Sequence, residues 1–521
     1  MIHDRAGSGE RCARPARINF VARMRALLVL LLPLAALAAL ATPSAPAAQE
    51  RPNVVLIMTD DQTLADMAAM PQTQRLLGAG GATFTRAYVS YPLCCPSRAT
   101  ALTGQYAHNH GVRSTTPPSG GVEALDADRA LPVWLRDAGY ETIHVGKYLN
   151  GYGLRRRPTV PPGWTDWHGL VDKSTYLMWG YSIHENGSTR TYGDPHVEDP
   201  ALYQTDVLAG LAVEAVEAHA GEDPFYLSFA PVAPHGELAR PGRTTQPYIR
   251  PAPRHRGRFA TLPLTDPAYD ELDTSDKPAY VRKLRRLGPR SHARIARDFR
   301  ARREALLAVD DAVAAVVAAL RRTGELDETY VLFTSDNGFF QGEHRISKGK
   351  YLAYEPSSHV PLLVRGPGIA PGTVSDQLVA NTDLAPTILA ATGAEADGPL
   401  DGRSLLPFAR DPTLRSARAV LHEGLVPGDT DRDAGSARAA GGAGVYDAVR
   451  TERYLDVHWR GGGRELYDRL LDPAELASVH ADPRYAGVRR RLDAALRRLR
   501  RCSGAVCLAP ARTGAPRRLR R

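Results

Sequence analysis

Four short apolar runs, each followed at once by polar residues, constrain the fold of this 521-residue chain most strongly. They cover residues 53–59, 140–145, 225–230 and 329–335, and helical patterns lie between them. Short buried strands that alternate with helices favour a mostly parallel sheet covered by helices. Ligands of such sheets bind beyond the carboxyl ends of the strands. We therefore expect the polar residues that follow these strands to meet in one crevice.

Two of these strands end in oxygen-bearing side chains. Asp60 and Asp61 follow the first strand, and Asp336 and Asn337 follow the fourth. A helix cap or a turn explains each pair taken alone. Three carboxylates gathered in one crevice, however, would raise one another's pKa unless a cation neutralised them. Oxygen ligands suit Ca²⁺, and Mg²⁺ less well here, whereas the motifs hold no His/Cys cluster suited to zinc.

The segment from Leu93 to Gly104 places a cysteine at the mouth of a short helix. Pro96 suits the first helical turn, and Gly104 is a natural end. The first-turn N–H groups then face Cys94, and Arg98 can reach the same point from one turn further on. This environment predicts an acidified, reactive thiol. A buried cysteine pair before an ordinary helix is the alternative.

The run Cys-x-Pro-Ser-Arg followed by Ala-Thr-Ala-Leu-Thr-Gly resembles the signature of the type I sulfatases. In that family the first cysteine of the motif, here Cys94, is oxidised to formylglycine. The resemblance implies an α/β fold of the alkaline-phosphatase-like type, with a mostly parallel central sheet flanked by helices and a smaller C-terminal α+β subdomain. Further stretches that resemble the family are residues 51–62, 334–338, 342–355 and 465–475.

The same resemblance assigns a role to each candidate site residue. The metal would be bound by Asp60, Asp61, Asp336, Asn337 and the modified Cys94. Arg98 would steady the formylglycine, Lys147 and Lys350 would bind sulfate oxygens, and His235 would protonate the leaving alcohol. The implied reaction is hydrolysis of a sulfate ester by covalent catalysis, in which hydrated formylglycine supplies the attacking hydroxyl. A formylglycine-generating enzyme is then a partner during maturation.

One stretch departs from the common sulfatase pattern. Many sulfatases carry a histidine two residues after the first lysine, but this chain reads Gly-Lys-Tyr-Leu-Asn from Gly146 to Asn150. His108, His110 or His344 could take that place, although a structural role is favoured for His110. The stretch 146–153, the Cys-Cys motif and Pro-Gly-Trp at 162–164 resemble the N-acetylglucosamine-6-sulfatase and extracellular endosulfatase branch. The resemblance implies a sulfated amino sugar or glycosaminoglycan as substrate, with the 6-O-sulfate of N-acetylglucosamine favoured.

Two other functions stay open at this point. The same superfamily and nucleophile act on phosphoryl centres, so a phosphodiesterase or phosphonate monoester hydrolase is the nearest alternative. A non-catalytic binder of sulfated glycans would result if Cys94 were unmodified. The net charge of +9 is modest for this length, and no nucleic-acid-binding signature is present.

The ends of the chain suggest its organisation. Residues 1–48 resemble a signal segment for export, with either Met1 or Met24 as the start, which predicts a secreted protein without stable membrane insertion. An uncleaved anchor is the alternative. We expect a catalytic domain over 49–405, a C-terminal subdomain over 406–500 and a solvated basic tail over 501–521. Export favours a local disulfide between Cys502 and Cys507, although pairing of either with Cys94 or Cys95 stays open.

Smaller features receive structural interpretations. The apolar spacing predicts a helix over 297–323, with the polar pair Asp310-Asp311 at its surface or in helix packing. Residues 240–294, rich in proline and arginine, are expected to be an irregular surface region. A closing helix is predicted over 485–499.

Overall fold

The computed structural model describes residues 51–237, 249–424 and 445–516. The predicted export segment 1–48 and the last five residues of the basic tail lie outside the described residues. Within the described ranges, no helix combines the length and the apolar character needed to cross a bilayer.

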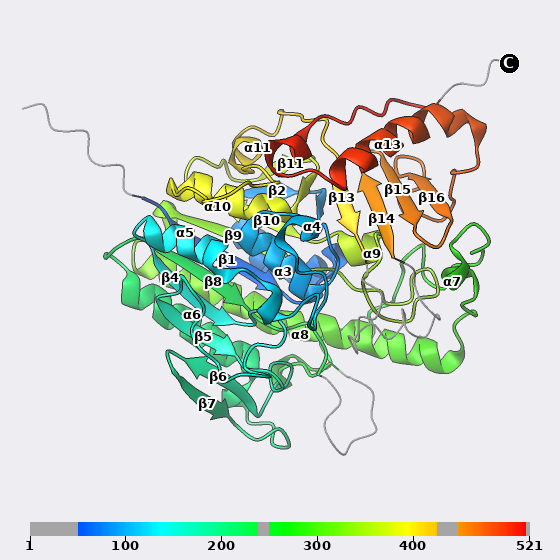
Figure 1. Ribbon diagram of the computed structural model, residues 1–521. Coiled ribbons are helices and arrows are strands. Elements are labelled where there is room, and N and C mark those ends of the chain that lie inside the picture. Colours follow the sequence, from blue (N-terminus) through cyan, green and yellow to red (C-terminus); the bar gives the residue numbers. More distant parts are fainter. Residues whose placement is uncertain (1–50, 238–248, 425–444, 517–521) are drawn as a thin grey trace, which may run out of the picture. The chain divides into compact units, whose positions relative to one another are not determined.

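A ten-stranded sheet forms the centre of the fold (Figure 1). Its middle is parallel, whereas β10, β6 and β7 run antiparallel to their neighbours, so the prediction of a mostly parallel sheet is confirmed. In spatial order the strands are β11 (Thr373–Ser375), β2 (Ala82–Phe84), β10 (Leu362–Arg365), β9 (Thr329–Ser335), β1 (Asn53–Thr59), β8 (Phe225–Ala230), β4 (Glu141–Gly146), β5 (Asp166–Leu170), β6 (Tyr181–Glu185) and β7 (Ser188–Tyr192).

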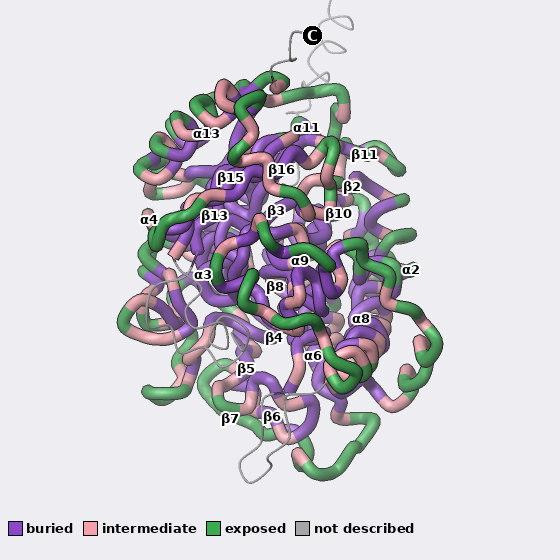
Figure 2. Tube along the Cα trace, turned by 90° about the vertical axis from the view of Figure 1, so that its right-hand side faces the viewer, coloured by how far each residue is buried: buried purple, intermediate pink, exposed green. Residues whose placement is uncertain are grey.

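Helices cover both faces of this sheet because alternate side chains of its strands are apolar on both sides. Val55 and Ile57 of β1 pack towards one helical layer, and Leu56 and Met58 pack towards the other. Figure 2 shows the central strands buried and many connecting loops exposed. The first layer contains α6 (Gln204–His219) and α8 (Pro289–Arg322), and the second contains α3 (Cys94–Thr103), α5 (Leu131–Asp137) and α10 (Leu384–Thr392).

A smaller antiparallel sheet follows towards the C-terminus, in the order β13-β14-β15-β16. It packs against α13 through apolar residues such as Val449, Leu466, Leu492 and Leu496. The helix confirms the prediction of a closing helix, while the domain boundaries at 405 and 500 stay predictions. The bounds are β13 (Val420–Glu423), β14 (Tyr446–Arg450), β15 (Tyr454–Trp459), β16 (Arg464–Asp468) and α13 (Ala486–Leu499).

The cysteines near the C-terminus, Cys502 and Cys507, form the local disulfide that the sequence favoured, while Cys94 and Cys95 are free and buried.

Short elements connect the layers of the fold. The short elements are α2 (Pro71–Thr73), α4 (Ala107–His110), α7 (Ala279–Arg282), α9 (Glu355–Ser358), α11 (Leu406–Arg410) and the parallel pair β3 (Ala87–Tyr88) and β12 (Val379–Ala380).

The long helix α8 begins eight residues earlier than the apolar spacing predicts. Gly288 precedes it and Pro289 occupies its first turn, a favoured helix start. Residues 289–294 are exposed or half-buried, and Ile295 is the first buried residue of the helix, so hydrophobic periodicity could not reveal this start. The described part of 240–294 is mostly irregular, as predicted, although it also holds α7 and buried residues such as Tyr280.

Candidate active site

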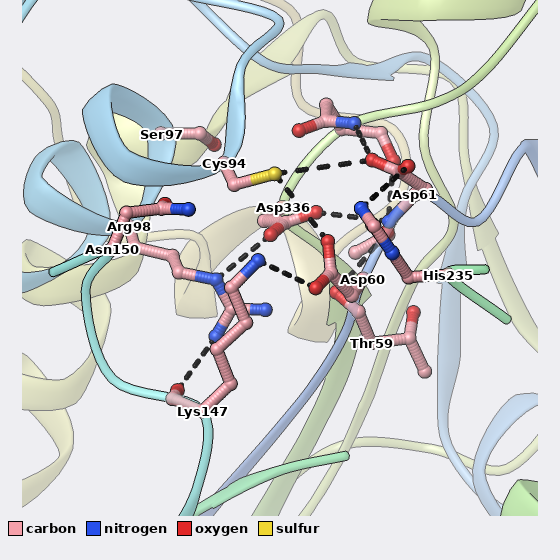
Figure 3. A network of polar contacts seen from close by, with 12 residues as sticks. Thr59, Asp60, Asp61, Cys94, Ser97, Arg98, Lys147, Asn150, His235 and Asp336 are labelled. Atoms are coloured by element: carbon pink, nitrogen blue, oxygen red, sulfur yellow. Dashed lines mark hydrogen bonds and ion pairs between the residues drawn. The ribbon is translucent and has the colours of Figure 1, made fainter. Parts of the chain in front are cut away.

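Helix α3 carries Cys94 into a buried polar cluster at the carboxyl ends of β1 and β9 (Figure 3). Leu93 is extended and Gly104 is left-handed at φ 67°, so the helix begins and ends as the sequence predicts. The Cys94 Sγ lies 3.4 Å from Asp60 Oδ1 and 4.0 Å from Asp61 Oδ1. Its exposed fraction is 2%, so the group faces this cluster rather than bulk solvent.

The oxygen ligands converge because β1 and β9 pair in parallel register. Thr59 lies opposite Ser335, which brings the residues that follow both strands together. One ligand atom from each of Asp60, Asp61, Cys94 and Asp336 lies within 4.8 Å of the other three, and all four residues are buried.

Asn337 adds a further oxygen to this cluster. Its Nδ2 donates to Asp61 Oδ1 at 2.6 Å, and its Oδ1 is buried with no hydrogen-bond partner among the described residues. Three carboxylates and an amide oxygen are a donor set for a hard divalent cation. The residues present therefore fit the predicted metal.

Three cations surround the carboxylates. Lys147 Nζ lies 2.5 Å from Asp60 Oδ2, and Lys350 Nζ lies 2.6 Å from Asp61 Oδ1 and 2.7 Å from Cys94 Sγ. Arg98 Nε donates to Asp336 Oδ2 at 2.8 Å, and its Nη1 donates to the Lys147 carbonyl at 2.9 Å. These cations provide the positive field that an anionic substrate requires.

The charges shift the pKa values of the carboxyl groups in opposite directions. Burial alone would raise the pKa of Asp60, but the surrounding cations, Lys147 first, hold it well below its usual range. Burial and the neighbouring Asp60 raise the pKa of Asp336. Asp60 is therefore an anionic anchor at neutral pH.

The prediction of an acidified thiol at position 94 is wrong: the surrounding residues raise the pKa of Cys94 and do not lower it. Burial raises the pKa of Cys94 well above its ordinary value, and the charge of Asp60 raises it further. Lys147 and Lys350 oppose these effects without overcoming them. The sequence argument considered only the helix N-terminus, which lowers a thiol pKa. Removal from water and neighbouring carboxylates raise that pKa.

His235 follows β8 and reaches the cluster from the side. Its Nδ1 donates to the carbonyl of Gly236 at 2.7 Å, so Nε2 is the nitrogen that faces the site. Nε2 lies 3.7 Å from Asp61 Oδ2. When the ring is charged, Nε2 carries a proton that can be given to a group bound at this point.

The three histidines considered for the missing position lie elsewhere. His110 contacts Thr100 at 3.0 Å, and burial lowers the pKa of its ring to about 3, so the ring is neutral at neutral pH. His108 contacts the Cys502 carbonyl at 2.9 Å, and His344 contacts Glu271 at 2.7 Å. The structure therefore brings together all nine predicted site residues but none of these histidines.

Two residues at the site were missed by sequence reasoning. Arg302 of α8 is 2% exposed and donates to the backbone carbonyl of Asp61. Tyr176 packs against the His235 ring in a tilted arrangement, with 4.4 Å between ring centroids. An arginine on the buried face of α8 was a signal for the first, whereas nothing in the local sequence distinguishes Tyr176 from a core tyrosine.

A pocket opens beside His235 and Asp61. One wall comes from α8 and the opposite wall from the loop that follows β9, and the lining combines apolar side chains with charges. The lining residues include Ile249, Ile295, Asp298, Arg302, Phe339 and Lys348. Asp61 and His235 both line this pocket, and Asp61 also binds Lys350, so the pocket adjoins the cation cluster.

The parallel sheet and the cluster at its carboxyl ends define a hydrolase of the alkaline-phosphatase-like class. The family model described as Sulfatase matches residues 52–394. An arylsulfatase of Volvox carteri is 34% identical over 512 residues, covering 89% of this chain and 77% of that protein. The N-acetylglucosamine-6-sulfatase of Homo sapiens is 34% identical over 511 residues, covering 89% of this chain and 87% of that protein.

A solved structure with a similar fold is that of a protein in complex with its substrate, D-glucosamine-2-N,6-O-disulfate. It has a TM-score of 0.72 and 23% identity, covering 86% of this chain and 97% of that chain. The chain belongs to the sulfatase family and is a sulfuric ester hydrolase.

Proposed function

We propose that this sulfatase removes sulfate from a sulfated amino sugar or glycosaminoglycan, with the 6-O-sulfate of N-acetylglucosamine as the favoured group. Several relatives are named for that activity, including the human protein above. The lining of the pocket beside His235 supports a sugar as the leaving group, because Phe339 offers an apolar face while Asp298 and Lys348 offer polar contacts.

The proposal includes formylglycine at position 94 and Ca²⁺ as the metal. The observation that carries it is the position of Cys94, buried at the N-terminus of α3 against two carboxylates and Lys350. Asp60, Asp61, Asp336, Asn337 and residue 94 would hold the cation. Hydrated formylglycine, a geminal diol, would supply the nucleophilic hydroxyl for attack on sulfur.

The chain's own residues would bind the ester and move its proton. Lys147 and Lys350 would neutralise the sulfate oxygens, and Arg98 would hold Asp336 and the end of β4 in place. His235 would donate the Nε2 proton to the departing oxygen, which lies on the side of the pocket.

We further propose that the chain is exported through its residues 1–48 and matured by a formylglycine-generating enzyme. Extracellular sulfatases among the relatives support secretion. A catalytic domain over 49–405 and a subdomain over 406–500 complete the proposed organisation.

Two measurements on the protein from its own host test this function. The tryptic peptide that contains Cys94 should be lighter by about 18 Da than its cysteine form, since O replaces SH₂. The enzyme should release sulfate from N-acetylglucosamine 6-sulfate faster than it cleaves an aryl phosphodiester or phosphonate monoester. An unmodified thiol in an active enzyme would overturn the formylglycine proposal, and a preference for the phosphoryl esters would overturn the substrate assignment.

A further inference from the structure

We infer that Tyr176 is a positioning residue, which holds the proton donor His235 and the sulfate-binding Lys147 in their working places. The inference rests on the proposed roles of those two residues. Tyr176 lies in the segment between β5 and β6 and is 7% exposed. It belongs to neither the metal cluster nor the cations around it.

The ring of Tyr176 contacts both groups at once. Its centroid lies 4.4 Å from that of His235, with 35° between the ring planes, so it covers one face of the imidazole. The Lys147 Nζ lies 4.9 Å from the same centroid, within the range of a cation–π contact. A single side chain therefore limits the movement of the imidazole and of the ammonium group.

Hydrogen bonds fix Tyr176 at both of its ends. Gln204, the first residue of α6, donates from Nε2 to the carbonyl of Thr175 at 2.8 Å and to that of Leu177 at 2.7 Å. At the other end, Asn150 Nδ2 donates to the Tyr176 hydroxyl at 2.8 Å. Gln204 is fully buried, and such paired contacts on both flanking carbonyls restrict the backbone that carries the ring.

The same segment is tied to the loop of His235. Glu237, two residues after the histidine, accepts from the backbone N–H of Met178 at 2.9 Å. Arg250 binds the same Glu237 oxygen at 3.0 Å. The segment that carries the Tyr176 ring is thus tied to the His235 loop by the Glu237 side chain, in addition to the contact between the two rings. This second link is expected of a residue that supports the imidazole.

The chemistry predicts which substrates depend on this support. When the bond between sulfur and the ester oxygen breaks, the electron pair stays on that oxygen, and the Nε2 proton of His235 neutralises it. A sugar alkoxide needs this proton, whereas 4-nitrophenolate leaves without it. A displaced His235 should therefore slow hydrolysis of the sugar sulfate selectively, whereas a displaced Lys147 should weaken binding of both esters equally.

The test compares kcat/KM for N-acetylglucosamine 6-sulfate and for 4-nitrophenyl sulfate. Tyr176→Leu should lose at least about 10-fold more activity on the sugar sulfate than on the aryl sulfate, within the contribution of a general acid. Tyr176→Phe keeps the ring and should stay within about 3-fold of wild type in this ratio. Gln204→Leu, which leaves the ring but removes its backbone support, should shift the ratio in the same direction as Tyr176→Leu.

The matched control is Tyr192→Leu. Tyr192 is 8% exposed, belongs to the same core cluster and stacks on Tyr181, but it lies away from the site. This variant should lose stability without changing the ratio. Equal losses on both esters in Tyr176→Leu, or in Gln204→Leu if the first variant does not fold, would overturn the positioning of His235. An unchanged kcat/KM on both esters would overturn the inference as a whole. A wild-type enzyme inactive on both sulfates would instead overturn the proposed function.

Discussion

Cys94 and Cys95 are adjacent and almost equally buried, yet their surroundings differ completely. Cys94 faces carboxylates and Lys350, while Cys95 packs in the apolar cluster beneath α3. Cys94→Ala should lower kcat by at least about 10³-fold, because it removes the proposed nucleophile. Cys95→Ala should keep activity and cost about 1 kcal/mol of stability. Activity assays and circular dichroism of both variants check this pair, and a fully active Cys94→Ala enzyme would contradict the mechanism.

Glu343 is a buried acid outside the metal cluster, and it predicts a pH dependence of stability. Burial, and then the charge of Asp266, raise the pKa of Glu343 from 4.5 to about 8. The folded state therefore holds a proton that the unfolded chain releases above pH 4.5, so the group destabilises the fold progressively as the pH rises from about 4.5 to 8.

Glu343→Gln removes this penalty while keeping an acceptor for the N–H of Gln341. Compared with wild type, the variant should gain on the order of 1–3 kcal/mol at pH 8 and nothing at pH 4.5. Urea unfolding at both pH values measures the difference. A gain that is the same at the two pH values would show that the carboxyl does not titrate in this window.

At the scale of elements, Asp310 links α8 to the start of α2. Its carboxylate accepts from the backbone N–H groups of Gln72 and Thr73, at 3.0 and 2.7 Å, and from the Thr73 hydroxyl at 2.7 Å. These contacts satisfy helix N-terminal donors that would otherwise be buried without partners. Asp310 therefore performs the helix-packing role that the sequence favoured for the polar pair.

Asp310→Ala should lower the free energy of unfolding by about 2–3 kcal/mol, since three donors lose their acceptor. The neighbouring Asp311 is partly exposed and binds Arg254 and His255 at the surface. Asp311→Ala should therefore cost about 0.5 kcal/mol or less. Chemical denaturation of the two variants makes the comparison, and equal losses would refute the capping role of Asp310.

The sequence correctly predicted the strands that appear as continuous apolar runs. The strands β1, β8 and β9 have the predicted bounds, and Cys94, Asp60 and Asp336 meet because parallel strand ends share one edge. Side-chain contacts that do not follow from a shared strand edge were not predicted, as with Arg302, which meets Asp61 across 241 residues. The pKa of Cys94 was also mispredicted, because burial beside carboxylates depends on packing that no local motif records.

At the scale of the whole molecule, the proposed cation would link elements that are far apart in the chain. Asp60 and Asp61 follow β1, Cys94 begins α3, and Asp336 and Asn337 follow β9. A ligand that binds only the folded state stabilises it by mass action, by about 2.7 kcal/mol at 100 times its dissociation constant. The metal should therefore contribute to stability as well as to catalysis.

Treatment with a chelator should lower the melting temperature by several degrees and abolish sulfatase activity. Added Ca²⁺ should restore both, and Mg²⁺ should restore them less well, because the proposed ion is Ca²⁺ and Mg²⁺ demands near-ideal octahedral geometry. Differential scanning fluorimetry and sulfate release are the measurements. An unchanged melting temperature in excess chelator would argue against a metal that joins these strand ends.

The distance in sequence between the site residues also means that they are synthesised at different times. Lys350, which contacts Cys94 directly, follows it by 256 residues. At about 5–20 residues per second, a ribosome needs about 13–50 s to make the intervening chain. During that interval the cysteine cannot be enclosed by its final partners, whereas in the finished fold only 2% of it is exposed. An enzyme that oxidises Cys94, as proposed, would therefore act on the growing or unfolded chain, and fast folding of the N-terminal half would compete with maturation.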